Sequence, residues 1–203
     1  MKNNINYEAK RSNSIVKNKV QKKDMIKKEV NVITNKKRKY LDVNMQDECE
    51  NTLLMLASKC GNYEYVKILI DFGAHLNTQN DQDDTALTLA SEYDNARCIE
   101  ILLNHGANIN MIDAHRDTAL MAASRLKYPE CVELLLKYNP DINIKNICGE
   151  TALIIASRCG NFQTVKLLLN AKADTTIVSN LGKTAVTAAK NNQIRDLILN
   201  FGR

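Results

Sequence analysis

The sequence lacks several features that mark other classes of protein. Its 203 residues include two prolines and no tryptophan, and no apolar run approaches the roughly 20 residues that cross a bilayer. The N-terminus, MKNNINYEAKRSNS, has no apolar segment of the kind that a secretory signal carries. With 44% hydrophobic and 25% charged residues, the composition is that of a globular protein. We therefore expect an intracellular protein with no membrane contact.

No motif of an enzyme or a metal site is present either. The sequence has no G-x-S-x-G, no Gly-rich phosphate loop, no H-E-x-x-H and no C-x-x-C pair. Its three histidines are far apart, and its six cysteines include Cys98 and Cys131, which are 33 residues apart. We expect free thiols in a reducing compartment rather than disulfides or zinc ligands. The sequence predicts a protein that is not an enzyme and that holds no cofactor or metal.

The formal net charge of +5 is unevenly divided along the chain. Residues 1–43 carry 13 Lys or Arg against 4 Asp or Glu, a balance of +9, whereas residues 44–203 carry 15 against 19, a balance of −4. A fold that binds phosphate backbones usually carries the positive charge itself. Contact with nucleic acid is therefore expected only from residues 1–43.

What the sequence does contain is a 33-residue period. Threonines stand on this grid without a gap, at Thr52, Thr85, Thr118, Thr151 and Thr184. They open the segments TLLMLAS, TALTLAS, TALMAAS, TALIIAS and TAVTAAK, and in the first four units a segment such as VKLLLNAKADTT follows about 14 residues later. A fixed period of this length predicts stacked units that bury their apolar faces against one another.

Each unit has the pattern of two short helices. The threonine opens a helix of small and apolar residues, Gly61 and Gly160 allow a turn in two copies, and a second helix carries an apolar stripe at helical spacing. That helix ends on Gly73, Gly106 or Asn139, residue types that accept the left-handed conformation. Extended turns such as NTQNDQDD project between the units.

These units resemble the ankyrin repeat, over residues 44–203. The family's T-P-L-H-x-A stands here as T-x-L/V-x-x-A, and its G-A-D-V-N ending as GAHLN, GANIN, NPDIN and KADTT. The resemblance implies an all-α repeat solenoid of five stacked 33-residue helix-turn-helix units with projecting hairpin loops. The units are expected at about 44–79, 80–112, 113–145, 146–178 and 179–203, the last being a shortened C-terminal cap.

The departures from the family pattern also carry expectations. The family's histidine is replaced by Met55, Thr88, Met121, Ile154 and Thr187, so we expect its hydrogen bond to be lost. Residues 1–43 are expected to be a basic, flexible arm or a decayed repeat. The diverged, AT-biased repeats are similar to those of giant DNA viruses and of some intracellular bacteria, which suggests a role in host interaction.

The resemblance also places a candidate binding site. In this family the hairpin tips and the exposed side of the first helix form a concave face that binds another protein. On the tips the candidates are Glu48, Glu50, Asp81, Asp83, Asp84, His115, Arg116 and Lys183. On the first helices they are Lys59, Glu92, Arg125 and Arg158. A generic solvated face is the alternative, but this graded set of charges favours a monomer that binds a protein of complementary charge.

Two other functions stay open. The cluster Lys36, Lys37, Arg38 and Lys39, with Lys22 and Lys23 twelve residues before it, resembles a bipartite nuclear-localisation signal. The protein would then be a nuclear regulator that uses the basic arm for targeting or nucleic-acid contact, instead of a cytoplasmic protein. The second alternative is a substrate adaptor of an enzyme complex.

Overall fold

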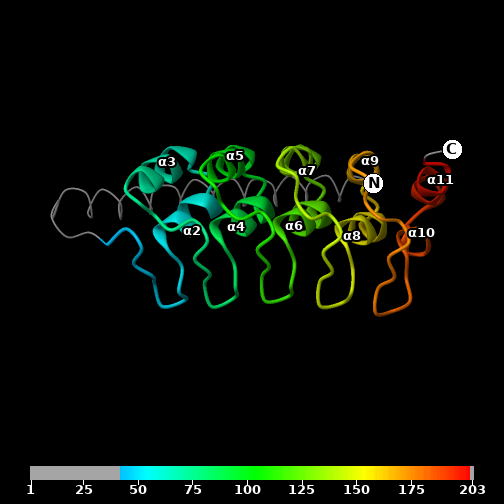
Figure 1. Cartoon of the computed structure of the whole chain (residues 1–203), viewed down its shortest axis with the longest axis horizontal. Coiled ribbons are helices and arrows are strands. Elements are labelled where there is room, and N and C mark those ends of the chain that lie inside the picture. The colour runs from blue at the N-terminus through cyan, green and yellow to red at the C-terminus, as the bar shows by residue number, and fades with distance from the viewer. Residues whose placement is uncertain (1–41, 202–203) are drawn as a thin grey trace, which may run out of the picture. The chain divides into compact units, whose positions relative to one another are not determined.

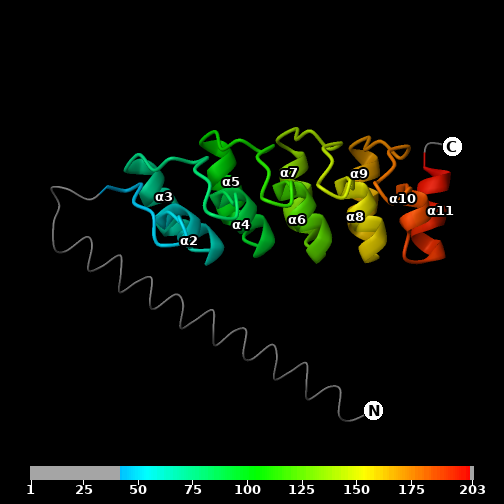
Figure 2. The same cartoon turned by 90° about the horizontal axis from the view of Figure 1, so that it is seen from below.

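The computed structural model describes residues 42–201, and residues 44–203 form one compact unit. Two layers of helices stack side by side in this unit, with loops projecting from one side (Figures 1 and 2). The first layer consists of α2 (Leu53–Lys59), α4 (Ala86–Glu92), α6 (Ala119–Leu126), α8 (Ala152–Cys159) and α10 (Ala185–Ala188). The second consists of α3 (Tyr63–Asp71), α5 (Ala96–Asn104), α7 (Pro129–Leu136), α9 (Phe162–Asn170) and α11 (Asn192–Asn200). The described residues thus form an all-α solenoid of helix pairs, as the repeat predicts.

Every first-layer helix begins directly after a threonine of the 33-residue grid. In each case the threonine side chain accepts the backbone N–H three residues on, as an N-cap does. The expectation that the hydrogen bond of the missing histidine is lost is wrong for three repeats, in the first of which the backbone N–H of Thr52 donates to Met55 Sδ at 3.3 Å. The backbone N–H of Thr85 donates to Thr88 Oγ1 at 2.8 Å, and that of Thr184 donates to Thr187 Oγ1 at 2.9 Å. A threonine hydroxyl accepts this bond because it can reach back to the cap, whereas Ile154 has no acceptor atom in its side chain.

The first layer is the interior of the stack. Residues 86–91 of α4 and 152–157 of α8 are buried without exception, and their alanines let neighbouring helices approach closely. The second-layer helices bury one face only, on which Val66, Ile99 and Val132 are fully buried at 33-residue spacing. Burying each such side chain contributes roughly 1.5–3 kcal/mol. The buried core residues therefore recur with the same 33-residue period as the sequence.

A left-handed residue follows each of the first four second-layer helices. The backbone φ is +86° at Gly73, +92° at Gly106 and +51° at Asn139, as the sequence predicts. Lys172 stands at the same position with φ of +63°. A residue with a Cβ is strained in this region, so the fourth repeat carries a small local cost.

An asparagine ladder joins consecutive repeats. The side-chain oxygen of Asn44 accepts the backbone N–H of His75 at 2.7 Å, and the oxygen of Asn77 accepts that of Asn108 at 2.8 Å. Asn110 and Asn143 make the equivalent bonds to Asp141 and Asp174. These are the asparagines of the GAHLN-type endings, which therefore fix the register between one repeat and the next.

The last helix pair has the shortest first-layer helix. Helix α10 has 4 residues, against 7 or 8 in α2, α4, α6 and α8, whereas α11 keeps 9 residues. The last unit is thus shortened in its first helix, α10, and not in its second, α11. On α11, Arg195 is exposed, and Ile194 and Ile198 provide the buried face.

Candidate protein-interaction face

The hairpin tips are closed by one side chain in each repeat. The Oδ1 atom of Asn80 accepts the backbone N–H groups of Gln82 and Asp84, at 3.0 and 2.8 Å. Asp47, Asp113 and Asn146 make the same two bonds, to the residues two and four positions on. This Asx geometry holds the tips although Glu50, Asp83 and Arg116 occupy left-handed positions where Gly149 and Gly182 stand in other repeats. The Asx residues were missed by the sequence reasoning, although their 33-residue spacing could have revealed them.

The tips are also tied to one another. Backbone N–H groups of Asp81, Ala114, Ile147 and Asn180 donate to carbonyl oxygens of the preceding tip, on Cys49, Gln82, His115 and Cys148, over 2.9–3.3 Å. The loops project in a row from the same side of the helices (Figure 1). Because each tip is anchored to its neighbour, the row is a preorganised surface rather than a set of independent loops.

The predicted partner-binding residues are accessible. Asp84 and Lys59 are half-buried, and the other ten are exposed. Glu48, Glu50, Asp81 and Asp83 form no ion pair within residues 42–201. The acidic tips of the first two repeats therefore present uncompensated negative charge.

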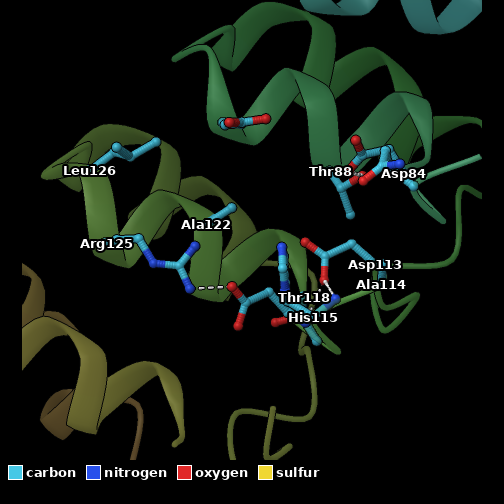
Figure 3. A pocket seen from close by; sticks show the side chains of 12 residues that line it. Asp84, Thr88, Asp113, Ala114, His115, Thr118, Ala122, Arg125 and Leu126 are labelled. Atoms are coloured by element: carbon cyan, nitrogen blue, oxygen red, sulfur yellow. Dashed lines mark hydrogen bonds and ion pairs between the residues drawn. The ribbon is translucent and has the colours of Figure 1, made fainter. Parts of the chain in front are cut away.

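A cavity of about 330 Å³ between the second and third repeats joins the two sets of predicted residues (Figure 3). Asp84 and His115 reach it from the tips, and Glu92 and Arg125 reach it from the ends of α4 and α6. Asp113 and Asp117 also line it, so four carboxylates face one guanidinium there. Burial, followed by the charges of Glu92 and Asp113, raises the pKa of the Asp84 carboxyl. The cavity is an acidic environment that favours a positive charge.

The predicted arginines are engaged within the chain. Arg125 forms an ion pair with Asp117, the residue before the threonine cap of α6. Arg158 makes the equivalent pair with Glu150 in the fourth repeat. In the second repeat the same two positions hold Asp84 and Glu92, both acidic. That repeat therefore keeps the carboxylate of the pair without its arginine.

Lys59 also has a partner within the chain. Its ammonium lies over the ring of Tyr93, 5.1 Å from the centroid, which joins the last turn of α2 to that of α4 as a cation–π contact. The cations of the first-helix face are thus held by the protein, whereas Glu48, Glu50, Asp81 and Asp83 on the tips have no ion-pair partner within residues 42–201.

The tips of the last two repeats carry three exposed aliphatic residues, which the charge-based reasoning missed. Leu181 is 83% exposed, Ile147 is 60% exposed and Val178 is 45% exposed. Ile147 lies on the tip of the fourth repeat and Leu181 on the tip of the fifth, and Val178 lies at the start of the fifth loop. The tips of the first two repeats carry Asp or Glu in this region. Ile147 stands where the first two repeats have Glu48 and Asp81, and this replacement was the signal that could have found it.

The cysteines differ in their surroundings. Cys98 and Cys131 are buried on the neighbouring helices α5 and α7, and burial raises the pKa of each thiol to about 12. The Cys131 thiol donates to Asp94 Oδ1 at 3.2 Å.

In the part of the chain that the structure describes, no three His, Cys, Asp or Glu side chains are grouped to hold a metal ion. No helix within residues 42–201 has the length and hydrophobicity to span a membrane. The candidate targeting residues Lys22, Lys23, Lys36, Lys37, Arg38 and Lys39 lie outside the described residues.

Comparison with known proteins agrees with this geometry. The family model described as ankyrin repeats (3 copies) matches residues 16–113, 54–146 and 120–201. No curated protein matches the chain with significant similarity. Ankyrin repeats are generally modules of protein–protein interaction. The helix pairs, the row of hairpins and the family match together show that the chain belongs to the ankyrin-repeat family.

Proposed function

We propose that this protein is a non-enzymatic interaction module that binds another protein through its hairpin tips and the exposed face of its first helices. The cavity between the second and third repeats carries this proposal, because tip and helix residues meet there around an unbalanced negative charge. The anchored row of tips supports it further, since a preorganised surface loses little conformational freedom on binding.

The distribution of charge sets the orientation of the partner. The free carboxylates lie at the first two repeats, and Arg116 and Lys183 follow on later tips. A partner with a basic region facing repeats one and two fits this order, and such complementarity contributes mainly to specificity and association rate. We infer that the twelve predicted residues form this surface, and that the protein serves in host interaction.

Affinity capture from a host-cell lysate tests the proposal. The full chain is compared with a variant that carries Asp81→Lys, Asp83→Lys and Asp84→Lys. We expect the variant to lose the proteins that the unmodified chain retains, with its melting temperature within a few degrees.

A matched control reverses three exposed carboxylates of the second-layer helices, Glu64, Glu100 and Glu130, to Lys. The change in net charge is the same, but these residues lie away from the tips. Equal retention by all three proteins would contradict the proposed face.

The basic segment favours a second candidate, a nuclear regulator. Its balance of +9 over residues 1–43 includes the clusters Lys22–Lys23 and 36–39. Fluorescent fusions with and without residues 1–43 separate the two functions. Nuclear signal that disappears with the deletion favours the regulator, and an unchanged cytoplasmic signal excludes it.

A further inference from the structure

Three exposed aliphatic residues form a surface on the tips of the fourth and fifth repeats. We call Ile147, Val178 and Leu181 the apolar tip surface. Asn180 joins the two tips, because its backbone N–H donates to Cys148 O at 2.9 Å and its side-chain Nδ2 donates to Ile147 O at 3.0 Å. These bonds hold Ile147 beside the loop that carries Leu181. A partner that covers these exposed aliphatic side chains removes apolar surface from water, which contributes to binding.

The acidic cavity lies two repeats earlier on the same row. In the third and fourth repeats an arginine occupies the position of Glu92. Arg125 binds Asp117, and Arg158 binds Glu150. In the second repeat Glu92 stands where the arginine would be, beside Asp84. The cavity next to this pair is open and has room for a side chain from outside. A guanidinium placed there by a partner would restore the pairing that the neighbouring repeats make internally.

We propose that the partner contributes an extended segment that places a basic side chain in the acidic cavity and aliphatic side chains on the apolar tip surface. This rests on the proposed function and names the chemistry of the partner. Stacked helices lie about 8–10 Å apart, so two repeats cover about 16–20 Å. An extended chain advances about 3.3 Å per residue. The basic and the aliphatic residues are therefore separated by about five or six positions.

A spacing series of synthetic peptides tests this inference on the full chain. Each fluorescein-labelled peptide carries one arginine and a leucine pair in a serine and threonine background, with the separation varied from about two to nine positions. Fluorescence anisotropy measures the affinity. We expect the tightest binding at a separation of five or six. At that spacing, replacing either the arginine or the leucines by serine is expected to weaken binding at least tenfold.

Two variants locate the contacts. Asp84→Asn with Glu92→Gln removes two of the four carboxylate charges of the cavity at constant shape, and Ile147→Ser with Leu181→Ser removes two of the three aliphatic side chains of the apolar tip surface. The first is expected to bind the full peptide no better than the peptide without arginine, and the second no better than the peptide without leucine. Ile68→Ser is the control, because it removes an exposed aliphatic side chain from α3, and it should leave binding unchanged. Circular dichroism melting establishes that all variants are folded.

The outcomes separate this inference from the proposed function. Failure of every peptide to bind, or affinity that is independent of spacing, overturns the inference. Loss of binding in the cavity variant alone overturns the apolar contact and leaves the charged face of the proposed function standing. If neither variant alters peptide binding and the charge-reversed variant also retains the captured proteins, the proposed function falls as well.

Discussion

The Arg158 guanidinium binds both carboxylate oxygens of Glu150, with Nε donating to Oε1 at 2.9 Å and Nη2 donating to Oε2 at 2.8 Å. The two side chains come from positions eight residues apart, one before the cap of α8 and one in its last turn. The Arg158 side chain is 49% exposed and that of Glu150 is 13% exposed. The pair thus connects the two ends of α8, with one partner largely shielded from water.

A double-mutant cycle on Arg158 and Glu150 should show a measurable coupling. Two parallel hydrogen bonds and partial burial make this pair stronger than an ordinary surface pair, and we expect about 0.5–1 kcal/mol from urea unfolding of Arg158→Ala, Glu150→Ala and the double variant. The coupling should decrease in high salt. The pair Lys137–Glu133, at 3.7 Å with both side chains well exposed, is the comparison and should couple less. Equal coupling in the two cycles would contradict the importance of the bidentate geometry.

The acidic cavity should lower stability at neutral pH. Burial, Glu92 and Asp113 raise the folded-state pKa of Asp84 above its ordinary value of 3.8. The folded protein therefore binds this proton more tightly than the unfolded chain, and stability falls as the pH rises through the folded pKa. Asp84→Asn is expected to raise the melting temperature at pH 7, and the difference should vanish below pH 3.8.

Asp174 provides a control of opposite sign. Hydrogen bonds from the side chain and the backbone N–H of Thr176 lower the pKa of its carboxyl. This group stabilises the fold above its unfolded pKa, and the contribution is lost as the pH falls through the folded pKa. Asp174→Asn should therefore lower the melting temperature at pH 7. The same direction of change in both variants would show that charge in the cavity is not the cause.

Relief of strain at Lys172 should stabilise the fourth repeat. Its φ of +63° suits glycine, which has no Cβ to clash, and Lys172→Gly is expected to raise the free energy of unfolding by up to about 1 kcal/mol. The measurement is equilibrium unfolding in urea. Lys166→Gly is the matched control, because Lys166 lies inside α9 in right-handed helix, where glycine costs about 1 kcal/mol. A loss of stability in both variants would count against the left-handed assignment.

Much of the fold follows from the sequence because it depends on local rules that repeat every 33 residues. Thr118 caps a helix and Gly106 ends one for reasons contained in a few neighbouring positions. The site is less predictable. Arg125 was expected to face a partner, but Asp117 binds it, and this pairing depends on the path of the hairpin and the rotamers of two long side chains. Leu181 was overlooked because reasoning from charge ignores an exposed aliphatic residue, whose meaning depends on its neighbours in space.

The buried thiols should resist chemical modification. A pKa of about 12 leaves almost no thiolate on Cys98 or Cys131 at pH 8, and the thiolate is the reactive form. Cys49 and Cys148 are exposed. Iodoacetamide at pH 8 followed by mass spectrometry should modify the two exposed cysteines in the folded protein. Cys98 and Cys131 should react only after unfolding in guanidinium, and rapid labelling of either in the folded protein would contradict the packing of α5 on α7.

The tip of the fourth repeat should depend on one amide. Asn146 is buried, its Oδ1 accepts the backbone N–H groups of Cys148 and Glu150, and its Nδ2 donates to Asp117 Oδ1 at 2.8 Å. Asn146→Ala leaves all of these partners without their bonds and is expected to cost about 2–3 kcal/mol at any pH.

Asn146→Asp separates the two functions of that side chain. A carboxylate still accepts the two backbone N–H groups, as Asp113 does in the repeat before, but it cannot donate to Asp117 and places a second negative charge beside it. This variant should approach the stability of the unmodified protein at acid pH and lose stability as the carboxyl ionises. Urea unfolding at several pH values measures both variants. If the Ala and Asp substitutions gave the same loss of stability at every pH, the hydrogen bonds that the backbone N–H groups of Cys148 and Glu150 donate to this side chain would contribute nothing, because the Asp variant keeps an acceptor for them and the Ala variant does not.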